Sequence, residues 1–187
     1  IENFKEIREF LARNGLNHST DTDTEVIALL AQHFINQGLA PRDAAEQTIA
    51  RLEGAYALCF LFDGHDDLLI AARKGSPLAI GHGIGEMFVG SDAIALAPMT
   101  DKITYLEEGD WAVITRNSVE IWDAGGMLAN RDMKVIQIDT SRVDKSGYKH
   151  FMAKEIAEQP TVLQGALSQY IKGDEITLPG EGIDFTK

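Results

Sequence analysis

The stretch Gly-Ala-Tyr-Ala-Leu-Cys-Phe-Leu-Phe, residues 54–62, decides the fold, because the chain changes there from helical to strand periodicity. Residues 55–62 are apolar at every position, which is typical of a strand covered on both faces. Cys59 lies in the middle of this run, so we expect a buried and unreactive thiol. The turn residues Asp63 and Gly64 follow, and residues 68–72 form the next apolar run, which predicts a returning strand.

Helical patterns precede this stretch and further strands follow it. Apolar residues recur at helical spacing within 4–11, 26–34 and 45–52, and Pro41 fits the first turn of the third helix. Strands are predicted at 78–80, 87–89, 102–106, 111–115, 119–122 and 135–138. The glycine-rich loop 81–85 leads into a strand and not a helix, which favours a hairpin over a phosphate-binding loop. Helices followed by strands predict an α+β fold.

The composition turns polar after residue 138, which predicts a domain of residues 1–138 and an extension of residues 139–187. Residues 139–147 are the expected linker. A helix is expected at 151–156, and Pro160 is expected to open a second helix. The apolar residues expected to face inward from that second helix are Leu163, Ala166, Leu167 and Tyr170.

Charge and cysteine content exclude several classes of function. The chain has 187 residues, with 17 basic and 29 acidic side chains and a net charge of −12, so we expect no nucleic-acid partner. A single cysteine excludes a disulfide framework within the chain. The longest apolar run is far shorter than the roughly 20 residues of a membrane helix. The chain opens on Ile-Glu-Asn without a signal-peptide pattern, so a cytoplasmic location is the expectation.

The densest polar cluster is residues 20–25. Thr22 with Glu25 matches a capping box, which would place Asp23 at the first helical position, where the helix dipole favours a carboxylate. The alternative function is that Asp23 presents its carboxylate to a cationic ligand. A calcium loop fits poorly, because Val26 stands where that loop requires glycine. The five histidines show no metal-binding spacing, so neither a metal nor a cofactor is expected.

Several separated segments resemble known enzymes. The first set is similar to glutamine amidotransferases with an N-terminal cysteine nucleophile: residues 1–3 (IEN), 22–27 (TDTEVI) and 52–57 (LEGAYA). The second set resembles the glucosamine-6-phosphate synthases among them: residues 72–78 (ARKGSPL), 91–92 (SD), 105–110 (YLEEGD) and 150–160 (HFMAKEIAEQP). Residues 150–160 look like the junction between two domains of that family, and amidophosphoribosyltransferases lack this junction.

The resemblance implies a two-domain enzyme. Its glutaminase domain, a four-layer αββα sandwich of the N-terminal-nucleophile hydrolase type, releases ammonia from L-glutamine. A sugar isomerase domain then uses this ammonia to convert fructose 6-phosphate into glucosamine 6-phosphate. Residues 1–138 would be the later part of the glutaminase domain, and residues 139–187 would lead into the isomerase domain. The resemblance also suggests a homodimer and requires no cofactor.

The sequence departs from the family at its catalytic residues. The family's nucleophile is its first residue, with its own amine as base, whereas this chain begins with Ile1 and Cys59 does not match that position. The family's substrate-holding His-Thr-Arg-Trp-Ala-Thr-His-Gly segment and its oxyanion Asn-Gly pair have no match either. We therefore expect no catalytic residue here and an inactive glutaminase in isolation. Asp23 alone matches a substrate contact, the aspartate that accepts the α-amino group of glutamine. A degenerate, non-catalytic binding module is the alternative.

Overall fold

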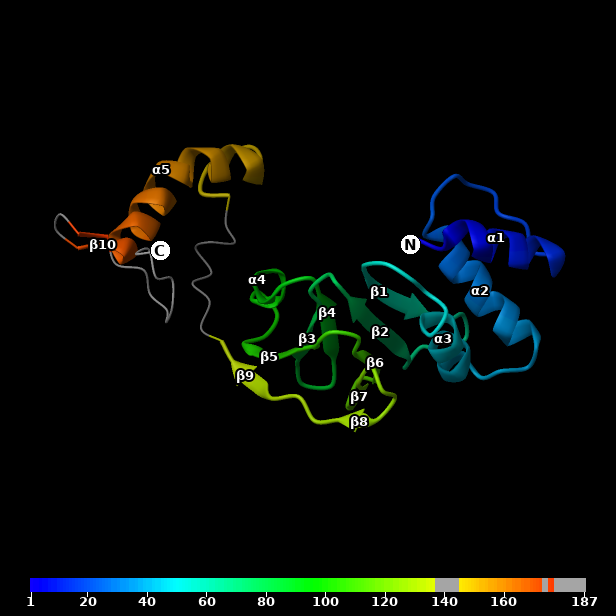
Figure 1. Ribbon diagram of the computed structural model, residues 1–187. Coiled ribbons are helices and arrows are strands. Elements are labelled where there is room, and N and C mark those ends of the chain that lie inside the picture. Colours follow the sequence, from blue (N-terminus) through cyan, green and yellow to red (C-terminus); the bar gives the residue numbers. More distant parts are fainter. Residues whose placement is uncertain (137–144, 173–174, 177–187) are drawn as a thin grey trace, which may run out of the picture. The chain divides into compact units, whose positions relative to one another are not determined.

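The computed structural model describes residues 1–136, 145–172 and 175–176 (Figure 1). The chain divides into two compact units, Ile1–Ile138 and Asp139–Lys187, which we describe separately. Most of the expected linker, residues 139–144, lies outside the described residues.

Three helices open the first unit, as the sequence predicts. They are α1 (Phe4–Arg13), α2 (Glu25–Asn36) and α3 (Pro41–Ile49). In α1, Ile7 and Leu11 lie one turn apart on the buried face, and the helix stops before Gly15, whose φ of 79° suits glycine. Pro41 begins α3, where its missing N–H leaves no helical hydrogen bond unmade.

The strands form two antiparallel sheets in this unit. Sheet A has the order β1-β2-β6-β7-β8, with β1 (Tyr56–Leu61), β2 (Leu69–Lys74), β6 (Trp111–Ile114), β7 (Val119–Trp122) and β8 (Leu128–Ala129). Sheet B has the order β4-β3-β5-β9, with β3 (Ala79–His82), β4 (Met87–Gly90), β5 (Lys102–Tyr105) and β9 (Met133–Val135). A short helix, α4 (Ala93–Leu96), follows β4. The mixed α+β class is confirmed, and so is the hairpin at loop 81–85, since β3 pairs with β4.

Three buried clusters hold the unit together. Helices α1–α3 pack on one face of sheet A, with Leu30 and Ile70 in that cluster. Ala71 and Ile80 belong to a second cluster, which joins sheet A to sheet B. The third cluster, with Leu96 and Ile103, joins sheet B to α4. Successive residues of β2 therefore point into different clusters, as the alternation of a strand requires.

The prediction that residues 55–62 are covered on both faces is wrong for β1. Tyr56 and Phe60 are buried, but Ala57, Cys59 and Leu61 are exposed, with Leu61 79% exposed. The reason is position: β1 is the edge strand of sheet A and pairs only with β2. The doubly covered strand is its neighbour β2, in which residues 70–72 are all fully buried.

Two arginines lie over aromatic rings and connect α3 to sheet A and to the other two helices. The Arg42 guanidinium of α3 lies 4.7 Å from the Trp122 ring centre and 5.5 Å from that of Trp111, and the two indoles stack at 4.6 Å. Arg51 lies 4.9 Å from the Phe10 ring centre and 5.0 Å from that of Phe34. These cation–π contacts connect α3 to sheet A and the end of α3 to both α1 and α2.

The second unit contains α5 (Phe151–Tyr170) and a short antiparallel pair, β10 (Ile171–Lys172) and β11 (Glu175–Ile176). The prediction of two helices is wrong, because Pro160 lies inside a single helix. Figure 1 shows α5 changing direction along its length, as expected where proline removes a hydrogen bond. The inward-facing stripe is also wrong within the described residues, where Leu163 is 61% and Leu167 54% exposed.

The described part of the chain has neither a helix suited to crossing a membrane nor a metal-binding cluster. None of its helices combines the length and apolar character needed to cross a lipid bilayer. It also contains no cluster of three or more histidine, cysteine or acidic side chains that could hold a metal ion.

Candidate functional site

The loop before α2, residues 19–24, is closed by the side chain of Glu25 and not by the predicted capping box. Helix α2 begins at Glu25, and its N-cap residue, Thr24, makes no side-chain capping bond, so Asp23 lies outside the helix. One Glu25 oxygen accepts the Ser19 N–H and hydroxyl, both at 2.7 Å. The other accepts the Thr20 N–H at 2.7 Å and hydroxyl at 2.6 Å. The first residue of the helix, Glu25, thus accepts hydrogen bonds from residues that precede the helix. The predicted bond from a threonine side chain to the first turn is not made.

The Arg8 side chain of α1 donates hydrogen bonds to the backbone of the same loop. One guanidinium nitrogen donates to the carbonyl oxygen of Thr20 at 3.1 Å and to that of Thr22 at 2.9 Å. The guanidinium also lies 5.1 Å from the Phe4 ring centre. Charge-assisted bonds of this kind are stronger than neutral ones, so the loop backbone is fixed to α1.

Asp23 is held at the surface of this loop, with 45% of its side chain exposed. Its carboxylate accepts a hydrogen bond from the α-ammonium group of Ile1 and a weaker one from the Thr24 hydroxyl at 3.3 Å. The bond from the ammonium lowers the pKa of the Asp23 carboxyl, so the group is ionised at neutral pH.

The first three residues are fixed by the segment that precedes β1. The Glu2 N–H donates to the Glu53 carbonyl at 2.9 Å, and the Asn3 side chain donates to the Arg51 carbonyl at 2.8 Å. Asn3 also accepts the Glu53 N–H at 3.1 Å. Gly54 has a φ of 99°, and a Cβ there would come within 2.8 Å of Glu2. Three motif segments, 1–3, 22–27 and 52–57, therefore meet in space.

We expect the Glu25 carboxyl to titrate near pH 2. Its hydrogen bonds from Thr20 and Ser19 lower the pKa from the ordinary 4.5 to about 2. Because the pKa is lower in the folded chain, ionised Glu25 stabilises the fold above about pH 4.5, and this contribution is lost as the pH falls from 4.5 towards 2. Carboxyl carbon NMR shifts followed against pH measure this pKa directly.

Thr20→Val removes one hydroxyl donor and should raise the pKa of Glu25. Thr115→Val is the matched control, because the Thr115 hydroxyl bonds only within the turn to Ser118 and its neighbours. A Glu25 pKa of 4 or above in the unsubstituted chain would contradict the loop geometry.

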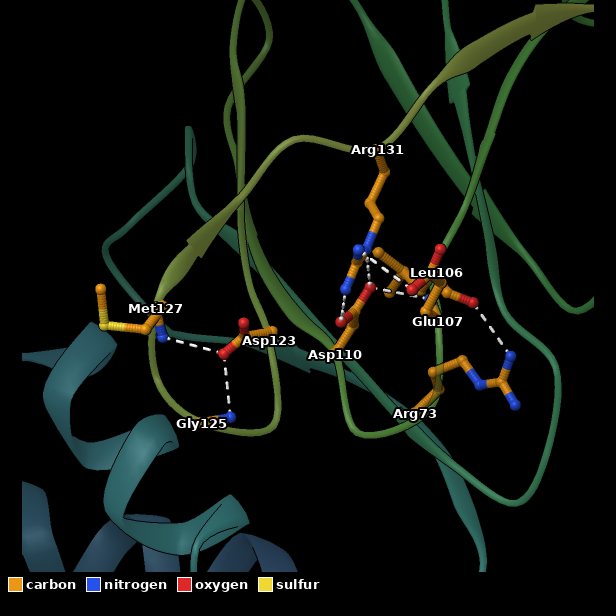
Figure 2. Close-up of polar contacts among 8 residues, drawn as sticks. All are labelled: Arg73, Leu106, Glu107, Asp110, Asp123, Gly125, Met127 and Arg131. Atoms are coloured by element: carbon orange, nitrogen blue, oxygen red, sulfur yellow. Dashed lines mark hydrogen bonds and ion pairs between the residues drawn. The ribbon is translucent and has the colours of Figure 1, made fainter.

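A second polar cluster surrounds Asp110, immediately before β6 (Figure 2). The Asp110 side chain is fully buried and receives two parallel bonds from Arg131, at 2.8 and 2.9 Å. The Glu107 N–H donates to it at 2.7 Å, and the Glu107 carboxylate lies 3.0 Å from Arg131. The bonds to Asp110 raise the pKa of the Arg131 guanidinium. Arg131 lies between β8 and β9, so this pair fixes the chain where it passes from sheet A to sheet B.

Arg73 makes the neighbouring set of contacts. It donates to the Leu106 carbonyl at 2.9 Å and to the Glu108 carboxylate at 2.9 Å, and Glu108 also accepts the Gly75 N–H at 2.9 Å. Motif segments 72–78 and 105–110 are therefore bonded to each other. Arg73 and Glu108 are bonded to each other, so this cluster joins the two segments structurally.

Cys59 is exposed, so the prediction of a buried thiol is wrong. It lies on the outward face of the edge strand β1, for the reason given above. Desolvation by its neighbours raises the pKa of the thiol, which disfavours the nucleophilic thiolate. The prediction of an unreactive thiol keeps the support of this raised pKa, although the side chain is not buried as predicted.

A mostly apolar groove of about 660 Å³ lies between α2 and β1. Leu58 and Phe60 line it from β1, Ile27 and Ala31 line it from α2, and Thr24 also belongs to its lining. Asp23 is not among its lining residues, so the groove and the candidate carboxylate are separate features.

Sequence reasoning proposed Asp23 as a binding residue, which stays a prediction, and it did not find two arginines that fix the surrounding structure. Neither Arg8 nor Arg131 belongs to a recognisable motif, and each acts on a partner distant in the sequence. Glu25 carried a signal, its spacing from Thr22, but the bonds it makes are with Ser19 and Thr20.

The fold and its motif segments agree with a comparison against known protein families. Residues 1–98 match the family described as glutamine amidotransferase domain. The match covers more than half of the chain, so the chain belongs to this family.

Three individual relatives of this chain carry the same enzyme name. Glutamine–fructose-6-phosphate aminotransferase [isomerizing] from Bradyrhizobium diazoefficiens is 54% identical over 91% of this chain and 28% of its own length. The enzyme of the same name from Mesorhizobium japonicum is 52% identical over 91% of this chain and 28% of its own. That from Brucella abortus is 47% identical over the whole chain and 31% of its own. The chain thus spans 28–31% of the length of these curated relatives.

Proposed function

We propose that this chain is part of a glutamine-dependent aminotransferase that makes D-glucosamine 6-phosphate and L-glutamate from D-fructose 6-phosphate and L-glutamine. The observation that carries the proposal is the 47–54% identity to glutamine–fructose-6-phosphate aminotransferases, which extends over 91–100% of the chain. The motif segments of the first unit support it, because 1–3, 22–27 and 52–57 are bonded to one another and 72–78 is bonded to 105–110.

In this proposal Asp23 binds the α-ammonium group of glutamine. Its carboxylate is about half-exposed and lies in a loop that Glu25 closes, so a cationic group can approach it from solvent. A charge-assisted bond to the ammonium would select an amino acid over a simple amide, since an amide leaves the carboxylate unpaired.

The proposed fold is the four-layer αββα sandwich of the N-terminal-nucleophile hydrolases. Support comes from the three buried clusters, which follow one another from α1–α3 through sheets A and B to α4. We assign residues 1–138 to the later part of the glutaminase domain, and residues 139–187 to a linker and the first helices leading into a sugar isomerase domain. A cytoplasmic homodimer remains our expectation for the complete enzyme.

The nucleophile of the proposed enzyme lies outside these 187 residues. Cys59 is the only cysteine, and its strand position and raised pKa do not suit a nucleophile. The role left for this chain is to build the glutaminase scaffold and to supply one contact to glutamine.

Activity assays of two proteins test the proposal. The complete protein that contains this chain should form glucosamine 6-phosphate from fructose 6-phosphate and glutamine, whereas residues 1–187 alone should not hydrolyse glutamine. Product is measured as the amino sugar phosphate, and hydrolysis as released glutamate. Glutamine binding by the complete protein without either product would favour the non-catalytic binding module instead. Hydrolysis by residues 1–187 alone would contradict our account of the nucleophile.

A further inference from the structure

We infer that Glu25 is a positioning residue for glutamine: it closes the loop that presents Asp23, and glutamine affinity depends on it through Asp23 alone. This inference rests on the proposed role of Asp23. Glu25 does not bind the ligand itself, because each of its two oxygens already accepts two hydrogen bonds from the loop.

The bonds of Glu25 enclose Asp23 within a short ring of backbone. Ser19 and Thr20 begin the loop and Glu25 ends it, so the four hydrogen bonds at 2.6–2.7 Å join its two ends. Fixing both ends removes backbone freedom that a ligand would otherwise have to remove on binding, which raises affinity without adding a contact. Asp23 lies two residues before Glu25 and shares its restricted backbone.

Arg8 gives the loop a second point of attachment. Its bonds are made to the carbonyls of Thr20 and Thr22, which precede Asp23 in the sequence. Glu25, which follows Asp23, is the first residue of α2. The carboxylate is thus held between two helices, α1 and α2. A loop restrained at both ends can keep one carboxylate at a fixed place even though nearly half of that side chain is exposed.

The loop contains a second carboxylate that distinguishes positioning from simple charge. Asp21 is exposed, and within the described residues its side chain has no hydrogen bond or ion pair. If negative charge near the loop were enough to bind glutamine, Asp21 and Glu25 would contribute equally to glutamine affinity. If geometry decides, Glu25 matters and Asp21 does not.

A double-mutant cycle in the complete enzyme tests the inference. Glu25→Gln keeps the size of the side chain but replaces one acceptor oxygen by a donor, so the loop opens at one end. We expect the KM for glutamine to rise about tenfold, the scale of a lost hydrogen bond to a charged group, with a much smaller change in kcat. In the Asp23→Asn background the same substitution should change KM less than about twofold, because coupled residues are not additive.

Two further variants keep the test independent of folding. Glu9→Gln removes an exposed α1 carboxylate and should leave KM unchanged. Thr20→Val removes one hydroxyl bond to Glu25 and should raise KM in the same direction by about threefold. Amide exchange at Ser19 and Thr20 should become faster in Glu25→Gln, which reports loop opening without reference to activity.

The outcomes separate the inference from the proposed function. If Glu25→Gln changed KM equally in both backgrounds, or in neither, the positioning role of Glu25 would be overturned. The proposed role of Asp23 in binding glutamine would be unaffected. If Asp23→Asn leaves KM unchanged, the proposed role of Asp23 fails. A rise in KM from Glu25→Gln would then show that the loop positions some other group, and the inference as stated would fail as well.

Discussion

We expect Asp23→Asn in the complete enzyme to raise the KM for glutamine by at least about tenfold. The substitution preserves shape but replaces a carboxylate by a neutral amide, so the charge-assisted bond to the ligand ammonium is lost. We keep the expected factor modest because nearly half of the side chain is exposed and solvent screens the pair. Steady-state glutaminase kinetics measure the effect, and isomerisation of the sugar phosphate without glutamine should be unchanged.

Asp21→Asn is the matched control for that experiment. It removes the same charge from the same loop, at a side chain with no described partner, and should leave KM within about twofold of the unsubstituted enzyme. An unchanged KM in Asp23→Asn, or equal effects of the two substitutions, would remove Asp23 from the site.

We expect Arg131→Met to lower the melting temperature of the first unit by about 8 °C. The reason is the fully buried carboxylate of Asp110, which loses both bonds from the guanidinium and keeps only the Glu107 N–H. A buried charge left without its partner is strongly destabilising. Thermal unfolding followed by circular dichroism measures the shift.

Two comparisons identify the cause of that loss. Arg116→Met removes an exposed arginine whose side chain makes no hydrogen bond or ion pair in the described part of the chain, and should change the melting temperature by about 1 °C or less. Adding Asp110→Asn to Arg131→Met neutralises the buried charge and should recover part of the loss. A melting temperature equal to that of Arg116→Met would show that Arg131 does not hold the passage between the sheets.

In the first unit, sequence patterns predicted which segments form helices and strands better than they predicted which faces of those segments are buried. The change of periodicity at residue 54 is local, and local spacing determines which segments become helices or strands. Whether a strand is covered depends on its place in the sheet, which the spacing does not contain. The apolar run 55–62 therefore indicated a strand correctly and its coverage wrongly: β1 became the edge, and β2 received both layers.

The candidate site shows the same division between local and distant information. Asp23 could be chosen because it lies in a compact polar motif that resembles a known family. Arg8 could not, because its bonds cross from α1 to the loop and leave no trace in spacing. Pro160 misled for a local reason: proline favours a helix start, but here the helix tolerates it in its interior.

The free edge of sheet A has a consequence for assembly. Within the described residues β1 pairs only with β2, so the backbone N–H and C=O groups along its other side have no strand partner. An edge of this kind can extend its sheet by pairing with a further strand. Sheet A can therefore grow at β1 without rearranging the strands that this chain already supplies.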